Sequence, residues 1–202
     1  MRLALAQINS VVGDIDGNAA RVADWLERAR AAEADLALFP ELVITGYPAE
    51  DLLLRPGFVR AARAAVDTVA AATNGITALV GAPLFEDGKL YNACFVLADG
   101  EVREVYRKHH LPNYGVFDED RYFEPGNDQV IVDGVGITVC EDIWIAGPPS
   151  SELGEEGEVG LGRAGAVEPV GDSGGVPVDV ADDAIDLGQC ESHRFSPLSL
   201  KP

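Results

Sequence analysis

Asp35-Leu-Ala-Leu-Phe-Pro-Glu-Leu-Val-Ile-Thr-Gly-Tyr-Pro48 is the stretch of this chain that most directly indicates its fold. Its first five residues form a short apolar run that Pro40 stops, a pattern that predicts a buried strand. The residues after Pro40 then follow the carboxyl end of that strand. Because sites in α/β sheets form at the carboxyl ends of strands, Glu41 lies where a functional site is expected.

On both sides of this stretch, strands and helices alternate at first, and strands then run consecutively. Apolar residues at helical spacing predict one helix across 22–29, capped by Asp14 or Asp16, and a second from Pro56 to Val69. Turn signals at 86–89 and 98–101 predict a strand meander that ends near Tyr106. The predicted strands cover residues 2–8, 35–39, 76–81, 91–97, 129–132 and 136–140. This order predicts an α/β domain with a mixed sheet.

Composition limits the class of protein. The chain has 202 residues and a net charge of −19, which argues against binding nucleic acid or anionic membranes. No signal peptide or membrane-spanning run is visible, so the sequence predicts a cytoplasmic protein. Its cysteines, Cys94, Cys140 and Cys190, are too widely spaced for a disulfide framework or a zinc pattern. The adjacent His109 and His110 have no third ligand in view, so no metal is expected.

Three segments could support chemistry, and each ends or follows a predicted strand: Phe39–Pro48, Arg107–Glu119 and Gly136–Trp144. They contain Glu41, Lys108 and Cys140, residue types that together suit cleavage of an unactivated amide. A thiolate of Cys140 would attack the carbonyl, and Glu41 would accept the thiol proton. Lys108 and the backbone N–H of Glu141 would stabilise the oxyanion.

These segments resemble the carbon–nitrogen hydrolase (nitrilase) superfamily, and more closely the glutaminase domain of glutamine-dependent NAD synthetases. The likeness lies in PELVITGYPAEDLLL (40–54), RKHHLPNYGVFDEDRYFEPG (107–126) and VCEDIW (139–144), and it covers residues 1 to about 149. It implies an αββα sandwich, incomplete at its C-terminal side, that hydrolyses L-glutamine to glutamate and ammonia through a cysteine thioester. In that family a second domain uses the ammonia, with ATP and magnesium, to amidate nicotinic acid adenine dinucleotide.

The resemblance also implies roles for individual residues. It makes Glu41 the base, Lys108 the oxyanion-stabilising residue and Cys140 the nucleophile. Tyr114 and Phe117 match family residues that line the glutamine pocket, and Tyr47 and Glu141 are further candidates for it. The implied partners are glutamine and a synthetase domain, with a homo-oligomer as a further possibility. No cofactor is expected in this chain, because ATP and magnesium belong to the synthetase domain.

After Pro149 the family pattern stops. Residues 150–202 contain eleven acidic and three basic residues, nine glycines and no trusted helical or strand period. This composition predicts a largely disordered or poorly packed tail. We expect that the segment is translated in a shifted frame or that the gene is truncated. Three hypotheses stay open: a glutaminase portion of NAD synthetase, a stand-alone amidase for another small amide, or an inactive fragment.

Overall fold

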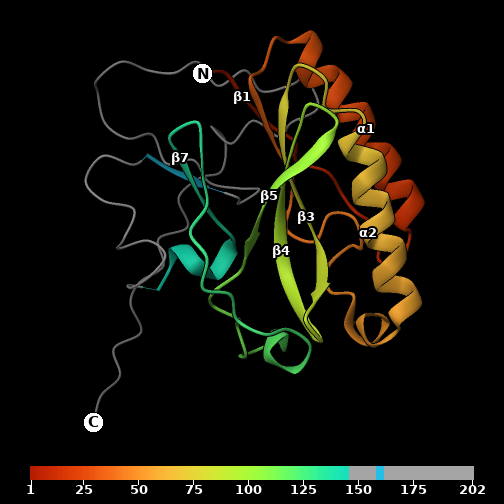
Figure 1. Cartoon of the computed structure of the whole chain (residues 1–202). Helices are drawn as coiled ribbons and strands as arrows, with labels where there is room; N and C mark the ends of the chain where they lie inside the picture. The colour runs from red at the N-terminus through yellow and green to blue at the C-terminus, as the bar shows by residue number, and fades with distance from the viewer. Residues whose placement is uncertain (146–157, 162–202) are drawn as a thin grey trace, which may run out of the picture.

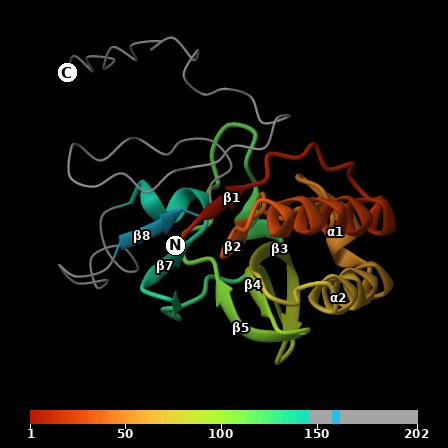
Figure 2. The same ribbon diagram turned by 90° about the horizontal axis from the view of Figure 1, so that it is seen from above.

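The computed structural model describes residues 1–145 and 158–161, which form two β-sheets and two α-helices (Figure 1). The larger sheet has the strand order β1-β2-β3-β4-β5, and the smaller has the order β6-β7-β8. Seen from above, both α-helices lie on one side of the larger sheet, while β7 and β8 lie on the other side (Figure 2). The strands are β1 (Leu3–Leu5), β2 (Leu36–Leu38), β3 (Thr77–Glu86), β4 (Lys89–Ala98), β5 (Glu101–Arg107), β6 (Ile131–Val132), β7 (Val135–Thr138) and β8 (Glu158–Leu161). The helices are α1 (Ile15–Ala31) and α2 (Pro56–Ala70), with short 3₁₀ turns η1 (Glu50–Leu54), η2 (Glu119–Arg121) and η3 (Cys140–Ile143).

Both predicted helices are present, and each has a start signal that explains its position. Asp14 caps α1, since its side chain accepts a hydrogen bond from the backbone N–H of Gly17 at 3.1 Å. Pro56 opens α2, where its missing N–H costs nothing. The helical spacing of apolar residues places one face of each helix against the larger sheet. None of the described helices is long and apolar enough to cross a membrane.

Strand direction brings two predicted site segments to the same edge of the larger sheet. β1, β2 and β3 are parallel, β4 is antiparallel to β3, and β5 is antiparallel to β4. β5 therefore runs in the same direction as β2. As a result, Glu41, which follows β2, and Lys108, which follows β5, both lie at the carboxyl edge.

Both faces of the larger sheet pack against other elements. One face packs with α1 and α2 in an apolar cluster that includes Val22, Leu26 and Val66. The other face meets the smaller sheet, where Leu79, Val96 and Ile137 are among the buried residues. The α/β sandwich predicted from the sequence is confirmed, and the described residues supply three layers of it: helices, larger sheet and smaller sheet.

Several predicted boundaries differ from the structure. The first strand covers only Leu3–Leu5 of the predicted 2–8, while β3 continues to Glu86 because it pairs with the whole of β4. Cys140 is not the last residue of a strand, because the chain turns there into η3. Glu158–Leu161 forms a strand parallel to β7 inside the segment for which the sequence predicted no order. The rest of the expectations for 150–202, Cys190 included, lie outside the described residues.

Candidate active site

Glu41 lies in a tight turn that packs against a glycine of the neighbouring strand. Leu42, the next residue, has a left-handed backbone with φ of 48°. A Cβ atom on Gly81 of β3 would lie 2.4 Å from the backbone N of Leu42 and 2.7 Å from the carbonyl oxygen of Pro40. Only a residue without a side chain allows this approach. Gly81 therefore sets the height of the Glu41 turn above the sheet.

Replacing Gly81 by Ala is expected to lower the free energy of unfolding by about 1–3 kcal/mol, because the clash is with backbone atoms that cannot move independently. Urea unfolding of the two chains would measure the difference. Gly57→Ala is the matched control, since a Cβ atom at Gly57 would have nothing within 4 Å. Equal stability of Gly81→Ala and Gly57→Ala would show that the close approach of the Glu41 turn to Gly81 does not matter for stability.

Lys108 is completely buried, and two carboxylates surround its ammonium group. Its Nζ lies 2.6 Å from Oε1 of Glu41, and 2.9 Å and 3.0 Å from the two oxygens of Glu119. Burial works against the charge, but the two carboxylates outweigh it and raise the pKa of Lys108. Backbone bonds fix the residue, because its N–H donates to the carbonyl of Asn92 at 2.9 Å and its carbonyl accepts from Gly126 at 2.8 Å. Lys108 is thus a fixed cation inside the site.

Glu119 is a site residue that the sequence reasoning did not identify. Its side chain is only 4% exposed, and Tyr47 donates to it through Oη at 3.1 Å. Burial, and then the nearby charge of Glu41, raise the pKa of Glu119. The residue lies at the end of the quoted segment Arg107–Glu119, but an acid after a polar loop gives no signal of burial.

Cys140 opens η3 directly after the smaller sheet and has a left-handed backbone with φ of 47°. Such a conformation is strained for a residue with a side chain, and this kind of strain is concentrated at functional sites. The charges of Glu41 and Lys108 both act on the thiol, in opposite directions. Burial, followed by the charge of Glu41, raises the pKa of Cys140 to about 11. The sulfur is therefore protonated at neutral pH and needs a base before it can attack.

A buried aspartate ties the cysteine turn to the segment that follows Lys108. Asp142 is fully buried, and each of its carboxylate oxygens accepts two hydrogen bonds. The donors are the backbone N–H groups of His109 (3.1 Å), His110 (2.8 Å) and Val139 (3.0 Å), and the hydroxyl of Tyr106 (2.8 Å). Because these donors come from both sides, Lys108 and Cys140 are held in fixed relative positions.

The predicted pocket residues form a row of side chains beside this centre. The ring centroids of Tyr47 and Phe117 are 6.3 Å apart, and those of Phe117 and Tyr114 are 5.5 Å apart. The hydroxyl of Tyr114 then donates to Glu141 at 2.9 Å. Tyr114 is 58% exposed, whereas Tyr47 reaches the buried Glu119. The row therefore leads from solvent to the carboxylates.

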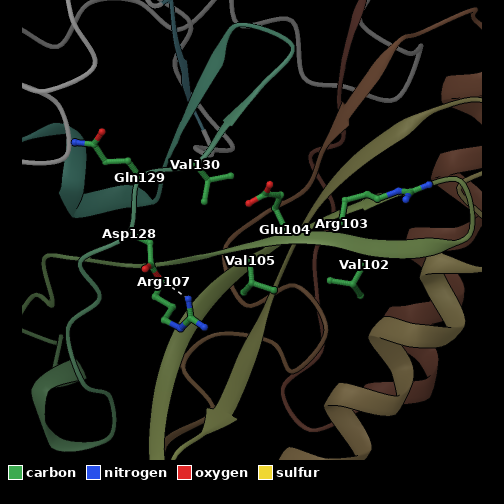
Figure 3. Close-up of a pocket in the computed structure, with 8 residues that line it drawn as sticks. All are labelled: Val102, Arg103, Glu104, Val105, Arg107, Asp128, Gln129 and Val130. Atoms are coloured by element: carbon green, nitrogen blue, oxygen red, sulfur yellow. Dashed lines mark hydrogen bonds and ion pairs between the residues drawn. The ribbon is translucent and has the colours of Figure 1, made fainter.

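Arg107, the neighbour of Lys108, belongs to a different environment. It forms ion pairs with Asp128 and Glu86 on the protein surface. Figure 3 shows Arg107 and Asp128 pointing toward one another in a groove between β5 and residues 128–130. None of the seven predicted site residues lines this groove. Across the described ranges, no cluster of three or more His, Cys, Asp or Glu side chains could hold a metal ion.

The family model for carbon-nitrogen hydrolases matches residues 2–148. The chain belongs to the carbon-nitrogen hydrolase family. A carbon-nitrogen hydrolase domain is thus the unit in which the thiol, carboxylate and ammonium groups are brought together.

Full-length relatives of this carbon-nitrogen hydrolase domain are larger enzymes. The glutamine-dependent NAD(+) synthetase of Xylella fastidiosa is 47% identical over 155 residues, which are 73% of this chain and 28% of that protein. The Thermotoga maritima synthetase is 45% identical over 159 residues, 76% of this chain and 27% of that protein. The chain thus spans little more than a quarter of the length of these relatives.

Solved structures show the same likeness. The ADP complex of glutamine-dependent NAD+ synthetase from Acinetobacter baumannii has a TM-score of 0.67 and 41% identity, covering 70% of this chain and 28% of that one. An amidase from Nesterenkonia sp. has a TM-score of 0.59 and 27% identity, covering 70% of this chain and 56% of that one. The fold is therefore shared with a synthetase and with an amidase.

Proposed function

We propose that the chain hydrolyses the side-chain amide of L-glutamine to glutamate and ammonia through a cysteine thioester. The observation that supports this most strongly is the meeting of three reactive groups from distant segments. Glu41 accepts from the ammonium of Lys108 at 2.6 Å, and the charges of both residues act on the thiol of Cys140. Glutamine is chosen because the relatives at 45–47% identity are glutamine-dependent enzymes.

The first step is transfer of the thiol proton to Glu41. Both Lys108 and Asn92 donate to Oε1 of this carboxylate, each at 2.6 Å. Oε1 is therefore occupied, and Oε2 is the oxygen that takes the proton. The Sγ atom of Cys140 then attacks the amide carbon, forming a carbon–sulfur bond while the carbonyl π electrons move to oxygen.

The second requirement is a donor for the oxyanion. Lys108 has three N–H groups, and both oxygens of Glu119 lie within 3.0 Å of its Nζ. One N–H is donated to Glu41. If the two oxygens of Glu119 share the second, the third N–H is left for the oxyanion. The backbone N–H of Glu141, directly after the nucleophile, is the second donor. Loss of one such donor typically lowers the rate by about 10²–10³-fold.

The remaining steps return the site to its starting state. The intermediate collapses, the carbon–nitrogen bond breaks, and protonated Glu41 gives its proton to the departing ammonia. Glu41 then takes a proton from water, whose oxygen attacks the thioester. Glutamate leaves as the sulfur regains its proton, so one glutamine and one water give one glutamate and one ammonia.

Substrate selection falls to the row of Tyr47, Phe117, Tyr114 and Glu141. A carboxylate at Glu141 suits the α-ammonium group of glutamine, and the aromatic rings suit its aliphatic stem. The ammonia would serve a synthetase domain of the kind that the relatives contain, and ATP and magnesium would bind to that domain. The hydrolase domain itself would need no cofactor.

The test is release of glutamate and ammonia from glutamine by the full 202-residue chain. Hydrolysis should be lost in Cys140→Ala and retained in Cys94→Ala. Cys94 is the matched control because it is buried in β4 and its pKa is raised to about 12 by burial, so it is inert. Hydrolysis that does not depend on Cys140 would refute the proposal.

A stand-alone amidase is the second candidate, supported by the likeness to the Nesterenkonia amidase. A panel of other ω-amides and carbamoyl compounds, assayed beside glutamine, separates the two. Faster Cys140-dependent hydrolysis of another amide favours the amidase. Absence of Cys140-dependent hydrolysis for every compound would favour an inactive fragment.

A further inference from the structure

One buried amide group lies between the two carboxylates of the site. Asn92 is the fourth residue of β4, and its side chain is 1% exposed. Its Nδ2 donates to Oε1 of Glu41 at 2.6 Å and to Oε2 of Glu119 at 3.2 Å. Its backbone carbonyl accepts from the N–H of Lys108 at 2.9 Å. Asn92 therefore bonds to both carboxylates and to the backbone of Lys108.

The other end of the same amide is left without a partner. Oδ1 of Asn92 is buried, and no described residue donates a hydrogen bond to it. An unsatisfied buried acceptor typically costs about 1–3 kcal/mol. Turning the amide over would place Oδ1 against the acceptor Oε1 of Glu41, which is unfavourable because neither oxygen carries a proton. The two carboxylates thus determine the orientation of the Asn92 side chain, and its Oδ1 atom is left without a hydrogen-bond donor.

We propose that Asn92 is a positioning residue that holds Glu41 in the orientation required for proton transfer. This inference rests on the proposed hydrolysis. With Asn92 and Lys108 both on Oε1, the carboxylate of Glu41 cannot rotate without breaking two hydrogen bonds. Oε2 is then the oxygen left to accept the proton of Cys140. The second bond, to Glu119, keeps the carboxylates apart around the single ammonium.

Loss of the Asn92 amide has consequences that differ from those of general destabilisation. Asn92 is buried behind Glu41, so substrate affinity should not change. Without the Asn92 donor the carboxylate of Glu41 can turn away from the thiol, so the loss should fall on kcat.

The test is Asn92→Leu, which has a similarly branched side chain and no donor, in the full chain. We expect kcat for glutamine to fall about 10–100-fold and KM to change less than 2-fold. Asn92→Ser, which retains a shorter donor, should recover part of kcat. Unchanged kcat in Asn92→Leu would overturn the inference.

Thr73→Val is the matched control for loss of a buried polar group. Thr73 is fully buried, and its hydroxyl donates to Ala70 at 2.7 Å, outside the site. The control should lose stability and keep the wild-type kcat and KM. If wild type itself does not hydrolyse glutamine, the proposed function fails, and this failure is distinct from that of Asn92.

A spectroscopic readout on the folded wild-type protein covers the case in which the Asn92 variants do not fold. The side-chain ¹⁵N–¹H signals of Asn92 should shift when Glu41 is replaced by Gln, because a neutral amide replaces the carboxylate that they contact. Signals that do not respond would overturn the inference.

Discussion

Replacing Glu41 by Gln is expected to abolish amide hydrolysis and, at the same time, to make the thiol of Cys140 more acidic. General base catalysis typically contributes about 10²–10⁴-fold to a rate, so kcat should fall by at least the lower value. Burial and then the charge of Glu41 raise the pKa of Cys140 to about 11, whereas the charge of Lys108 lowers it. With a neutral Gln, the influence of Lys108 is no longer opposed by Glu41.

The sign of the thiol effect can be measured without any turnover. A lower pKa gives more thiolate at a given pH, so iodoacetamide should modify Cys140 of Glu41→Gln faster than wild type near pH 8. The rate of alkylation from pH 6 to 11 would give the pKa of Cys140 in the wild type and in Glu41→Gln. Glu104→Gln is the matched control, because Glu104 is exposed on β5 in the groove of Figure 3. An unchanged alkylation profile would show that Glu41 does not act on the thiol.

Much of the fold could be predicted from local patterns. The apolar run at 35–39, stopped by Pro40, and the opening of α2 at Pro56 are local signals, and the structure confirms both. The prediction that Cys140 is the last residue of a strand is wrong. Its left-handed backbone depends on tertiary contacts, which a local pattern does not show. The strand Glu158–Leu161 gave no usable signal, since its pairing partner β7 is distant in sequence.

The site shows the same division. Glu41, Lys108 and Cys140 could be selected because their chemistry suits amide cleavage and each follows a predicted strand. Asn92 and Glu119 could not, because their importance comes from burial beside a cation. In the sequence, Asn92 is a polar interruption of an apolar strand, and Glu119 is one of several acids in a loop. The structure shows that β4 and η2 converge beside the end of β5. There Asn92 donates to Glu41 and Glu119, and Glu119 accepts from Lys108.

Lys108→Met is expected to have the largest effect on stability. The side chain of Lys108 is 0% exposed, and its removal leaves the carboxylates of Glu41 and Glu119, 17% and 4% exposed, without a cation. Removing one partner of a buried ion pair typically costs about 3–5 kcal/mol. Hydrolysis should also be lost, because the oxyanion loses a donor. Urea unfolding near pH 8 would measure the loss of stability.

The pH dependence of that loss tests whether charge is the cause. The pKa of Glu119 is already raised in the wild type, and without the ammonium it should rise further. A carboxyl whose pKa is higher in the folded state stabilises the fold below its unfolded pKa, and this contribution is lost as pH rises through the folded value. Lys108→Met should therefore regain stability between pH 8 and pH 5. Lys108→Met combined with Glu119→Gln removes one uncompensated charge, so it should be more stable than Lys108→Met at pH 8, with a weaker pH dependence and no recovery of hydrolysis. If the single variant lost the same free energy at both pH values, packing rather than charge would be the role of Lys108.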